Sequence, residues 1–347
     1  MTSMTIGGSR PSIGAAIGLV LMVGLGVLRP LPGLNQAAEA QTFTFGLIGD
    51  LGYYPQHEPW VENVFADISK DSALSFVVHV GDLSRPIHAC TDEYLNRRLA
   101  QFNGLPHPLV FTPGDNDWTD CHDRQGVKDG DPIAQLAKLR GMFFPGEQSL
   151  GKRTMPLVRQ SRDPQFTKFR ENVRWDIGSV TFVTLHVTGS NNNHGRTPQG
   201  DAEFAERNKA NLAWLGQAFA HAAASNSRAV MVLQQANMFP DITPFPGPRD
   251  KVSGTVDLRA ALERETIAFG KPVVLVHGDS HFFRIDNALF KRPARGNPGE
   301  PAPAHFTRVE TFGTPNHHWL HVTVDPNDSN VFTFRPRIVR ANVTKPQ

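Results

Sequence analysis

The chain has 347 residues, of which 39% are hydrophobic, 35 are Lys or Arg and 33 are Asp or Glu. This length suits two average domains or one large α/β domain, and the hydrophobic share is ordinary for a protein with a buried core. The formal net charge of +2 and the lack of a Lys/Arg-rich run interleaved with aromatic residues argue against a nucleic-acid-binding protein.

The first forty residues differ from the rest of the chain. Arg10 precedes an apolar, glycine-rich run over residues 13–28, and Ala38-Glu39-Ala40 matches the A-x-A cleavage signal. These features predict a secretory signal peptide, residues 1–40, which would export the protein to the periplasm or the extracellular space. The alternative is an uncleaved membrane anchor, which needs about 20 apolar residues. After cleavage we expect a single domain over residues 41–347 with no stable membrane span.

Strands and helices alternate in the first part of the mature chain. Strands are predicted over residues 42–48, 75–80 and 108–112, with helices over residues 58–69 and 92–102 between them. This succession predicts a parallel sheet with right-handed crossovers. A helix is predicted over residues 133–143. Residues 146–172 are polar without a clear period, and we expect a surface excursion near the site, because structureless loops of that length are usually functional.

The second part of the chain is predicted to add further strands and helices. Residues 174–177 and 180–187 flank Gly178-Ser179, which is typical of a hairpin. The next predicted elements are a loop (189–200), the longest helix (202–224), a buried strand (228–233), a proline-rich stretch (241–248), a helix (256–269), a strand (273–277) and a Pro/Gly loop (290–303). Strands over residues 307–312, 318–324 and 331–339 are expected to close the fold in antiparallel pairing.

Cys90 and Cys121 are the only cysteines. In an oxidising compartment an even count favours one disulfide, which would tie the loop after the second strand to the loop after the third. The alternative is two unpaired thiols.

Four predicted strands end in Gly-Asp, and the acids that follow them are Asp50, Asp82, Asp115 and Asp279. The carboxyl ends of such strands converge on the crevice where open α/β sheets bind ligands. A single Asp after Gly is usually a turn or a helix cap. Turn chemistry does not require His281 after the last of the four, so the set predicts a cation site.

The order Gly-Asp-x-Gly, Gly-Asp-Leu-Ser, Gly-Asp-Asn-Asp and Gly-Asp-Ser-His resembles the calcineurin-like metallophosphoesterases, and most closely their purple acid phosphatase branch. The resemblance extends over about residues 42–325. It implies an α/β fold in which a two-sheet β-sandwich is flanked by helices. It also implies two metal ions that clamp a phosphate and activate a water.

Some positions keep the family's ligands. Asp50 matches the carboxylate of the first metal, Asp82 matches the aspartate that bridges both metals, and His281 matches the second His of the family's Gly-His-x-His motif.

Other ligand positions depart from the family. Asp115 replaces an Asn ligand, although Asp117 is an alternative ligand, and Asp279 replaces a His ligand. Gln235, or Gln234 in the neighbouring register, replaces another strand-end His.

The family's catalytic His is also missing, because Asn116 stands in its place. A leaving alkoxide needs a general acid, and we expect His186 or His122 to supply the proton. The tyrosine of the purple branch falls on Arg85, so the iron-to-tyrosinate colour is expected to be absent.

The matched set therefore holds four acids and one imidazole. Such a site favours hard cations, two ions of Mn, Mg, Ca or Fe, over Zn. The extra carboxylates also lower the Lewis acidity of the metals, which makes a bound water harder to ionise.

Two functions follow. The first is an exported phosphoesterase that hydrolyses a small phosphate mono- or diester through a metal-bound hydroxide. The second is a metal-binding or interaction protein on the same fold with weak or no catalysis, and the missing catalytic His favours it. The sequence indicates no oligomeric state.

Overall fold

A computed structural model describes residues 41–239, 253–289 and 303–343. These residues belong to one compact unit, Ala40–Gln347. The predicted signal peptide, the proline-rich stretch 241–248 and nearly all of the predicted 290–303 loop lie outside the described residues. Within the described residues, no helix is long and apolar enough to cross a membrane.

The first sheet has the strand order β12-β11-β1-β2-β3. Its strands are β1 (Phe43–Ile48), β2 (Leu74–His79), β3 (Leu109–Phe111), β11 (Trp319–Val324) and β12 (Phe332–Arg337). The first three run parallel, with α1 (Glu58–Lys70) and α3 (Asp92–Gly104) in the crossovers, which confirms the predicted β-α-β-α-β unit. The strands β11 and β12 add to it in antiparallel pairing, as expected.

The second sheet has the strand order β4-β5-β6-β7-β8-β10-β9. Its strands are β4 (Val158–Arg159), β5 (Val173–Ile177), β6 (Val180–Thr184), β7 (Ala229–Leu233), β8 (Val273–His277), β9 (Arg284–Asp286) and β10 (Phe306–Glu310). The predicted hairpin is confirmed as β5 and β6. Gly178 (φ 55°) and Ser179 (φ 65°) both adopt the left-handed backbone that a tight hairpin turn requires.

One pairing prediction is confirmed only in part. The expected antiparallel pairing of β10 holds with β9, but β10 runs parallel to β8. Parallel pairing requires the chain to return to the end of the sheet where β8 begins, and the stretch between β8 and β10 is long enough to do so. The sequence gives little sign of β9 because this strand has three residues and no alternating pattern.

Residues 146–172 also differ from their prediction as a surface excursion. Leu150 forms a β-bridge with Leu109 beside β3, and residues 158–159 form β4. Leu157, Phe166 and Phe169 are buried. The buried Arg159 bonds three of the segment's backbone oxygens, and the backbone–backbone bonds of this segment run to turns and to residues distant in the sequence, so it shows no helical or strand period.

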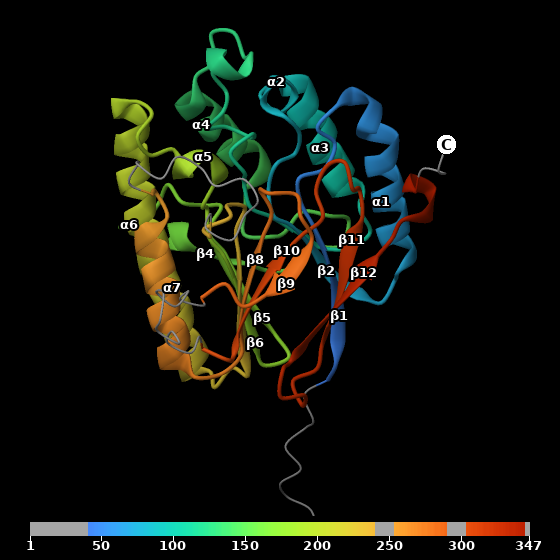
Figure 1. Cartoon of the computed structure of the whole chain (residues 1–347), viewed down its shortest axis with the longest axis vertical. Helices are drawn as coiled ribbons and strands as arrows, with labels where there is room; N and C mark the ends of the chain where they lie inside the picture. Colours follow the sequence, from blue (N-terminus) through green and yellow to red (C-terminus); the bar gives the residue numbers. More distant parts are fainter. Residues whose placement is uncertain (1–40, 240–252, 290–302, 344–347) are drawn as a thin grey trace, which may run out of the picture. The chain divides into compact units, whose positions relative to one another are not determined.

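Three hydrophobic clusters build the layers seen in Figure 1. One cluster joins the facing sides of the two sheets and includes Phe45, Phe76, Phe182 and Met231. A second packs the outer face of the second sheet against α6 (Pro198–Ala224) and α7 (Val256–Phe269). A third packs the outer face of the first sheet against α1, α3 and α4 (Pro132–Phe143). The result is a sandwich-like α/β fold with helices on both outer faces.

The short helical elements are η1 (Pro55–His57), α2 (Pro86–Ala89), η2 (Asp123–Gln125), η3 (Gln160–Arg162), α5 (Gly189–Asn192) and η5 (Arg340–Asn342).

Candidate functional site

The loops after β1, β2 and β8 share an unusual backbone. Asp50 (φ 54°), Asp82 (φ 57°), Asp279 (φ 76°) and His281 (φ 65°) are all left-handed. A side chain makes this conformation costly, although Asp tolerates it better than most residues. Costly backbone of this kind gathers at functional sites, where the surrounding structure holds it in place. The four residues are therefore candidates for a functional site, both because of their acidic and imidazole side chains and because of their left-handed backbone.

Direct contacts join the loop after β1, which carries Asp50, to the loop after β8, which carries Asp279 and His281. The backbone N–H of Asp279 donates to Asp50 Oδ1 at 3.0 Å, and His281 Nε2 lies 3.5 Å from the same oxygen. The other oxygen, Asp50 Oδ2, is buried and has no hydrogen-bond partner. This carboxylate therefore has one free coordinating atom directed into the protein.

Tyr53 occupies the space between these loops, a role that the sequence did not reveal. Its hydroxyl donates to Asp82 Oδ2 at 2.5 Å, lies 3.5 Å from Asp50 Oδ1 and is 3.0 Å from His281 Nε2. The only sequence signal was its position three residues after Asp50. The hydroxyl thus contacts all three side chains that match the family's retained ligands.

Asp115 joins the cluster through Gln235. Gln235 Nε2 donates to Asp115 Oδ1 at 2.9 Å, while its Oε1 accepts the N–H of Gly189 at 2.6 Å. Gln234 turns away and donates to the carbonyl of Ala236. Of the two registers left open by the sequence, the structure brings Gln235 to the acids.

Asp117 has a different position from Asp115. Its carboxylate accepts the N–H groups of Gly114 at 2.8 Å, Leu83 at 2.8 Å and Asp82 at 3.1 Å. The bonds to Leu83 and Asp82 hold the loop after β3 to the loop after β2. Of the two acids left open by the sequence, Asp115 contacts Gln235 and Asp117 holds the backbone.

The acids lie close together, with Asp50, Asp82 and Asp115 buried and Asp279 partly buried. Burial raises the pKa of Asp82 and Asp115 well above 3.8, and neighbouring carboxylates raise both further. Burial also raises the pKa of Asp279 to about 6. Burial alone would lower the pKa of His281, but its hydrogen bond with Asp50 and the charge of Asp50 outweigh this and raise the pKa to about 9. Such a cluster attracts a cation.

Gly189 lies between two of the acids. A Cβ at this position would lie 2.5 Å from Asp279 Oδ1 and 2.8 Å from both carboxylate oxygens of Asp115. Only glycine therefore lets the backbone lie this close to both carboxylates, which share one small space.

We expect Gly189→Ala to fill that space and to reduce divalent-cation binding, measured by calorimetry, by at least about tenfold, the lower end of the loss caused by disturbing the surroundings of metal ligands. Gly216→Ala is the matched control, because nothing lies within 4 Å of its Cβ position in α6. Equal binding by the two variants would show that the space between Asp115 and Asp279 holds no cation.

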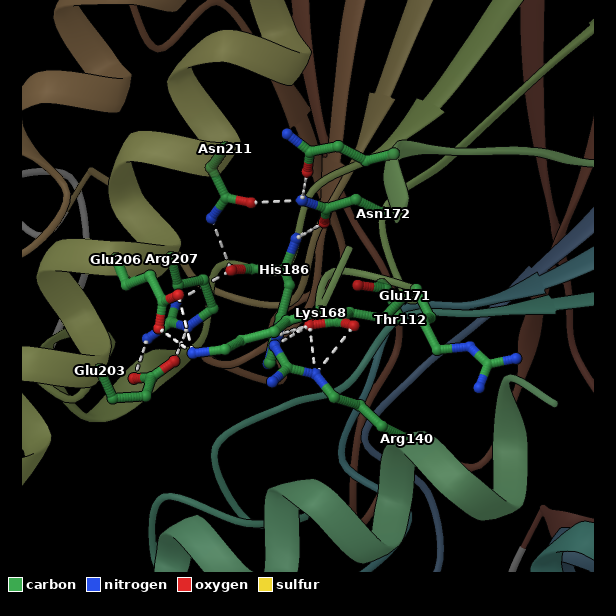
Figure 2. A network of polar contacts seen from close by, with 12 residues as sticks. Thr112, Arg140, Lys168, Glu171, Asn172, His186, Glu203, Glu206, Arg207 and Asn211 are labelled. Atoms are coloured by element: carbon green, nitrogen blue, oxygen red, sulfur yellow. Dashed lines mark hydrogen bonds and ion pairs between the residues drawn. The ribbon is translucent and has the colours of Figure 1, made fainter. Parts of the chain in front are cut away.

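His186 is not brought to the acid cluster. It is fully buried, and its Nδ1 lies 2.8 Å from Glu171 Oε1, in a network that also includes Arg140 (Figure 2). Burial lowers the pKa of His186 to about 4, despite the opposing effect of Glu171. A neutral imidazole without access to solvent is poorly placed to give a proton to a leaving group.

The other two predicted catalytic residues lie in the third loop. The backbone N–H of Asn116 donates to Asp82 Oδ1 at 3.1 Å, so Asn116 borders the cluster. His122 is half-buried farther along this loop, and partial burial together with the charge of Arg196 lowers its pKa. Arg196 itself is paired with Asp120 at 2.6 Å.

The disulfide between Cys90 and Cys121 is confirmed, with 5.7 Å between the Cα atoms. It joins the loops after β2 and β3 and is consistent with a secreted protein.

As the side chains stand, no group of three His, Cys, Asp or Glu residues within the described ranges is arranged to hold a metal ion. The hydroxyl of Tyr53 lies where such a group would converge. A cation bound between Asp50, Asp82 and His281 would need Tyr53 as a further ligand or would displace it.

No protein-family model matches the chain. No curated protein matches it either. One solved structure with some similarity is described as "GAP50 the anchor in the inner membrane complex of Plasmodium". The two chains are 11% identical, the match covers 86% of this chain and 89% of the other, and the TM-score is 0.43. A TM-score this low carries no argument about fold or function.

Proposed function

We propose that this chain is an exported, metal-dependent phosphoesterase of the calcineurin-like type, acting on a small phosphate mono- or diester. The observation that supports it most is the grouping of the buried Asp82 and Asp115 with the partly buried Asp279, which lies beside Asp115 at Gly189. Uncompensated buried charge is strongly unfavourable, and cations with oxygen ligands are the usual compensation.

The donor set fits hard metal ions. Asp50, Asp82 and His281 would hold one ion, with Asp82 shared, while Asp115, Asp279 and Gln235 would hold the other. The unpartnered Asp50 Oδ2 and the close approach of Asp115 and Asp279 to the same glycine, Gly189, agree with this assignment. The ions would be Mn, Mg, Ca or Fe, and when bound they would polarise the phosphate and supply an activated water.

The protein's own residues would orient these groups. Gln235 holds Asp115 through one amide hydrogen bond, and Asp117 holds the second and third loops together through three N–H groups. Asn116 cannot donate a proton as the family's His does. Tyr53, whose hydroxyl contacts Asp50, Asp82 and His281, carries a proton within this cluster, whereas His281 is assigned as a ligand. We therefore expect slow turnover with alkoxide leaving groups and faster turnover with aryl leaving groups, which need less protonation.

Metal analysis of protein purified without chelator, followed by assays of aryl phosphate mono- and diesters with Mg²⁺, Mn²⁺, Ca²⁺ or Fe³⁺, tests this proposal. We expect one to two ions per chain and turnover that chelator removes and metal restores. Protein without bound metal and without turnover under every condition would contradict the phosphoesterase.

The second function remains a cation-binding or interaction protein on the same fold. It is favoured by Asn116 in place of the catalytic His and by the Tyr53 hydroxyl between Asp50, Asp82 and His281. Stoichiometric metal without turnover in the same assays would support it.

A further inference from the structure

A groove of about 740 Å³ lies between α1 and the segment formed by β12 and η5. The residues of the acid cluster, Asp50, Asp82, Asp115, Asp279 and His281, do not line it. Four of its lining residues are basic, namely Lys70, Arg335, Arg337 and Arg340, and Asp67 is the one acidic lining residue. They come from three separate elements, which Figure 1 shows at the edge of the first sheet.

Hydrogen bonds fix the two walls of this groove. Asn63 Nδ2 of α1 donates to Asn342 Oδ1 of η5 at 2.9 Å. Asn342 Nδ2 donates in turn to the carbonyls of Trp60 at 2.9 Å and His317 at 2.8 Å. The spacing of the basic side chains is thus set by the fold and does not depend on a loop.

Within the part of the chain that the structure describes, no carboxylate pairs with the basic residues of the groove. Asp67 instead accepts the indole N–H of Trp319 at 2.9 Å. Arg337 lies over the same indole ring, 5.4 Å from its centroid. The one carboxylate that lines the groove is therefore bonded to Trp319, over which Arg337 lies.

This pattern differs from that of other arginines in the protein. Arg98, Arg140 and Arg207 each pair with a carboxylate at hydrogen-bond distance. Like charges that converge without counter-charges repel one another, so a concave surface of this kind attracts an anion.

We infer that this groove binds a small organic molecule that carries at least two phosphate groups. Three of the four cations are arginine, whose planar fork matches phosphate oxygens in a bidentate manner. The volume falls within the range of small-molecule sites, roughly 300–1,000 Å³. Ile338, which lines the groove and is 51% exposed, offers an apolar contact for the organic part of the ligand.

Calorimetric titration of the full mature chain with sodium tripolyphosphate tests the inference. We expect one saturable site, weakened at least tenfold in the double variant Arg335→Gln/Arg340→Gln. Both arginines are exposed and neither stacks on Trp319, so the fold should be retained, which circular dichroism would check. The control is Lys152→Gln/Lys209→Gln, which removes the same charge from two exposed lysines elsewhere and should leave the affinity unchanged.

Three outcomes would overturn the inference: no saturable binding, equal affinity in the groove variant and the wild type, or an equal loss in the control variant. Vesicles of anionic phospholipid provide a further arm. Vesicle binding that depends on Arg335 and Arg340, without saturable tripolyphosphate binding, would assign the groove to a membrane surface and reject the small-molecule site.

Discussion

Replacing Asp82 with Asn is expected to abolish stoichiometric metal binding and to lower aryl phosphate turnover by at least about 100-fold, while it raises the Tm of the metal-free protein. The functional loss should reach or exceed the 10- to 100-fold seen when groups that merely support a ligand are removed, because Asp82 is proposed to bridge both ions. Metal analysis, steady-state kinetics and thermal unfolding after chelation measure the three effects.

The gain in stability follows from the sign of the pKa shift. Burial, followed by the charges of Asp115 and Asp50, raises the pKa of Asp82 well above 3.8. Folding therefore opposes ionisation of this carboxyl, and the metal-free wild type loses stability as the pH rises above the unfolded-state pKa. Asn cannot ionise, so the Tm difference should be small near pH 4 and should grow toward pH 7.

A suitable control is Asp92→Asn, which removes a carboxylate from an exposed pair with Lys138. We expect this control to retain metal and turnover. The site assignment would be rejected if Asp82→Asn kept its metal, and the electrostatic account would be rejected if the variant melted at or below the wild-type temperature throughout the pH range.

Replacing Glu171 with Ala is expected to cost about 3–5 kcal/mol of unfolding free energy, the loss typical of breaking a buried charged pair. Glu171 is fully buried between Arg140, at 3.0 Å from Nε, and His186, at 2.8 Å from Nδ1 (Figure 2). Burial alone would raise its pKa, but the charge of Arg140 and the hydrogen bond from His186 lower it strongly. The variant leaves His186 buried without this partner and removes the carboxylate from the partly exposed Arg140.

Urea denaturation measures this loss, with Glu206→Ala as the matched control. Glu206 pairs with Lys168 on the surface, where both side chains are more than half exposed, so its loss should cost less than about 1 kcal/mol. Turnover per folded molecule should survive in Glu171→Ala if His186 has a structural role. A loss of turnover with unchanged stability would instead place His186 in the reaction.

The sequence predicted the strands and the Gly-Asp loops that carry the site, because both depend on local sequence patterns. Buried strands produce apolar runs, and the Gly-Asp pairs at their ends fixed where the acidic side chains begin. The partners of those side chains depend on contacts across the fold. Tyr53, Gly189 and the separate positions of Asp115 and Asp117 follow from loop backbones that no periodicity encodes.

The same limit explains one failed structural prediction and one that is confirmed only in part. Residues 146–172 looked irregular because their hydrogen bonds run to turns and to residues distant in the sequence, which leaves no regular pattern in the sequence. The direction of β10 depends on which end of the sheet the preceding chain returns to, and local composition does not encode that path.

The loops after β2 and β3 are fastened to each other twice, by the Cys90–Cys121 disulfide and by the three backbone bonds to Asp117. They should therefore move as one rigid body on the timescale of loop motions. The loop that carries Tyr53 and the loop that carries His281 are joined by non-covalent contacts, which include the N–H of Asp279 bonded to Asp50 Oδ1 at 3.0 Å and the Tyr53 hydroxyl at 3.0 Å from His281 Nε2. A cation that displaces the Tyr53 hydroxyl would therefore require the whole side chain to swing about its Cα–Cβ bond, because the hydroxyl lies on the axis of the ring and stays in place when the ring alone turns.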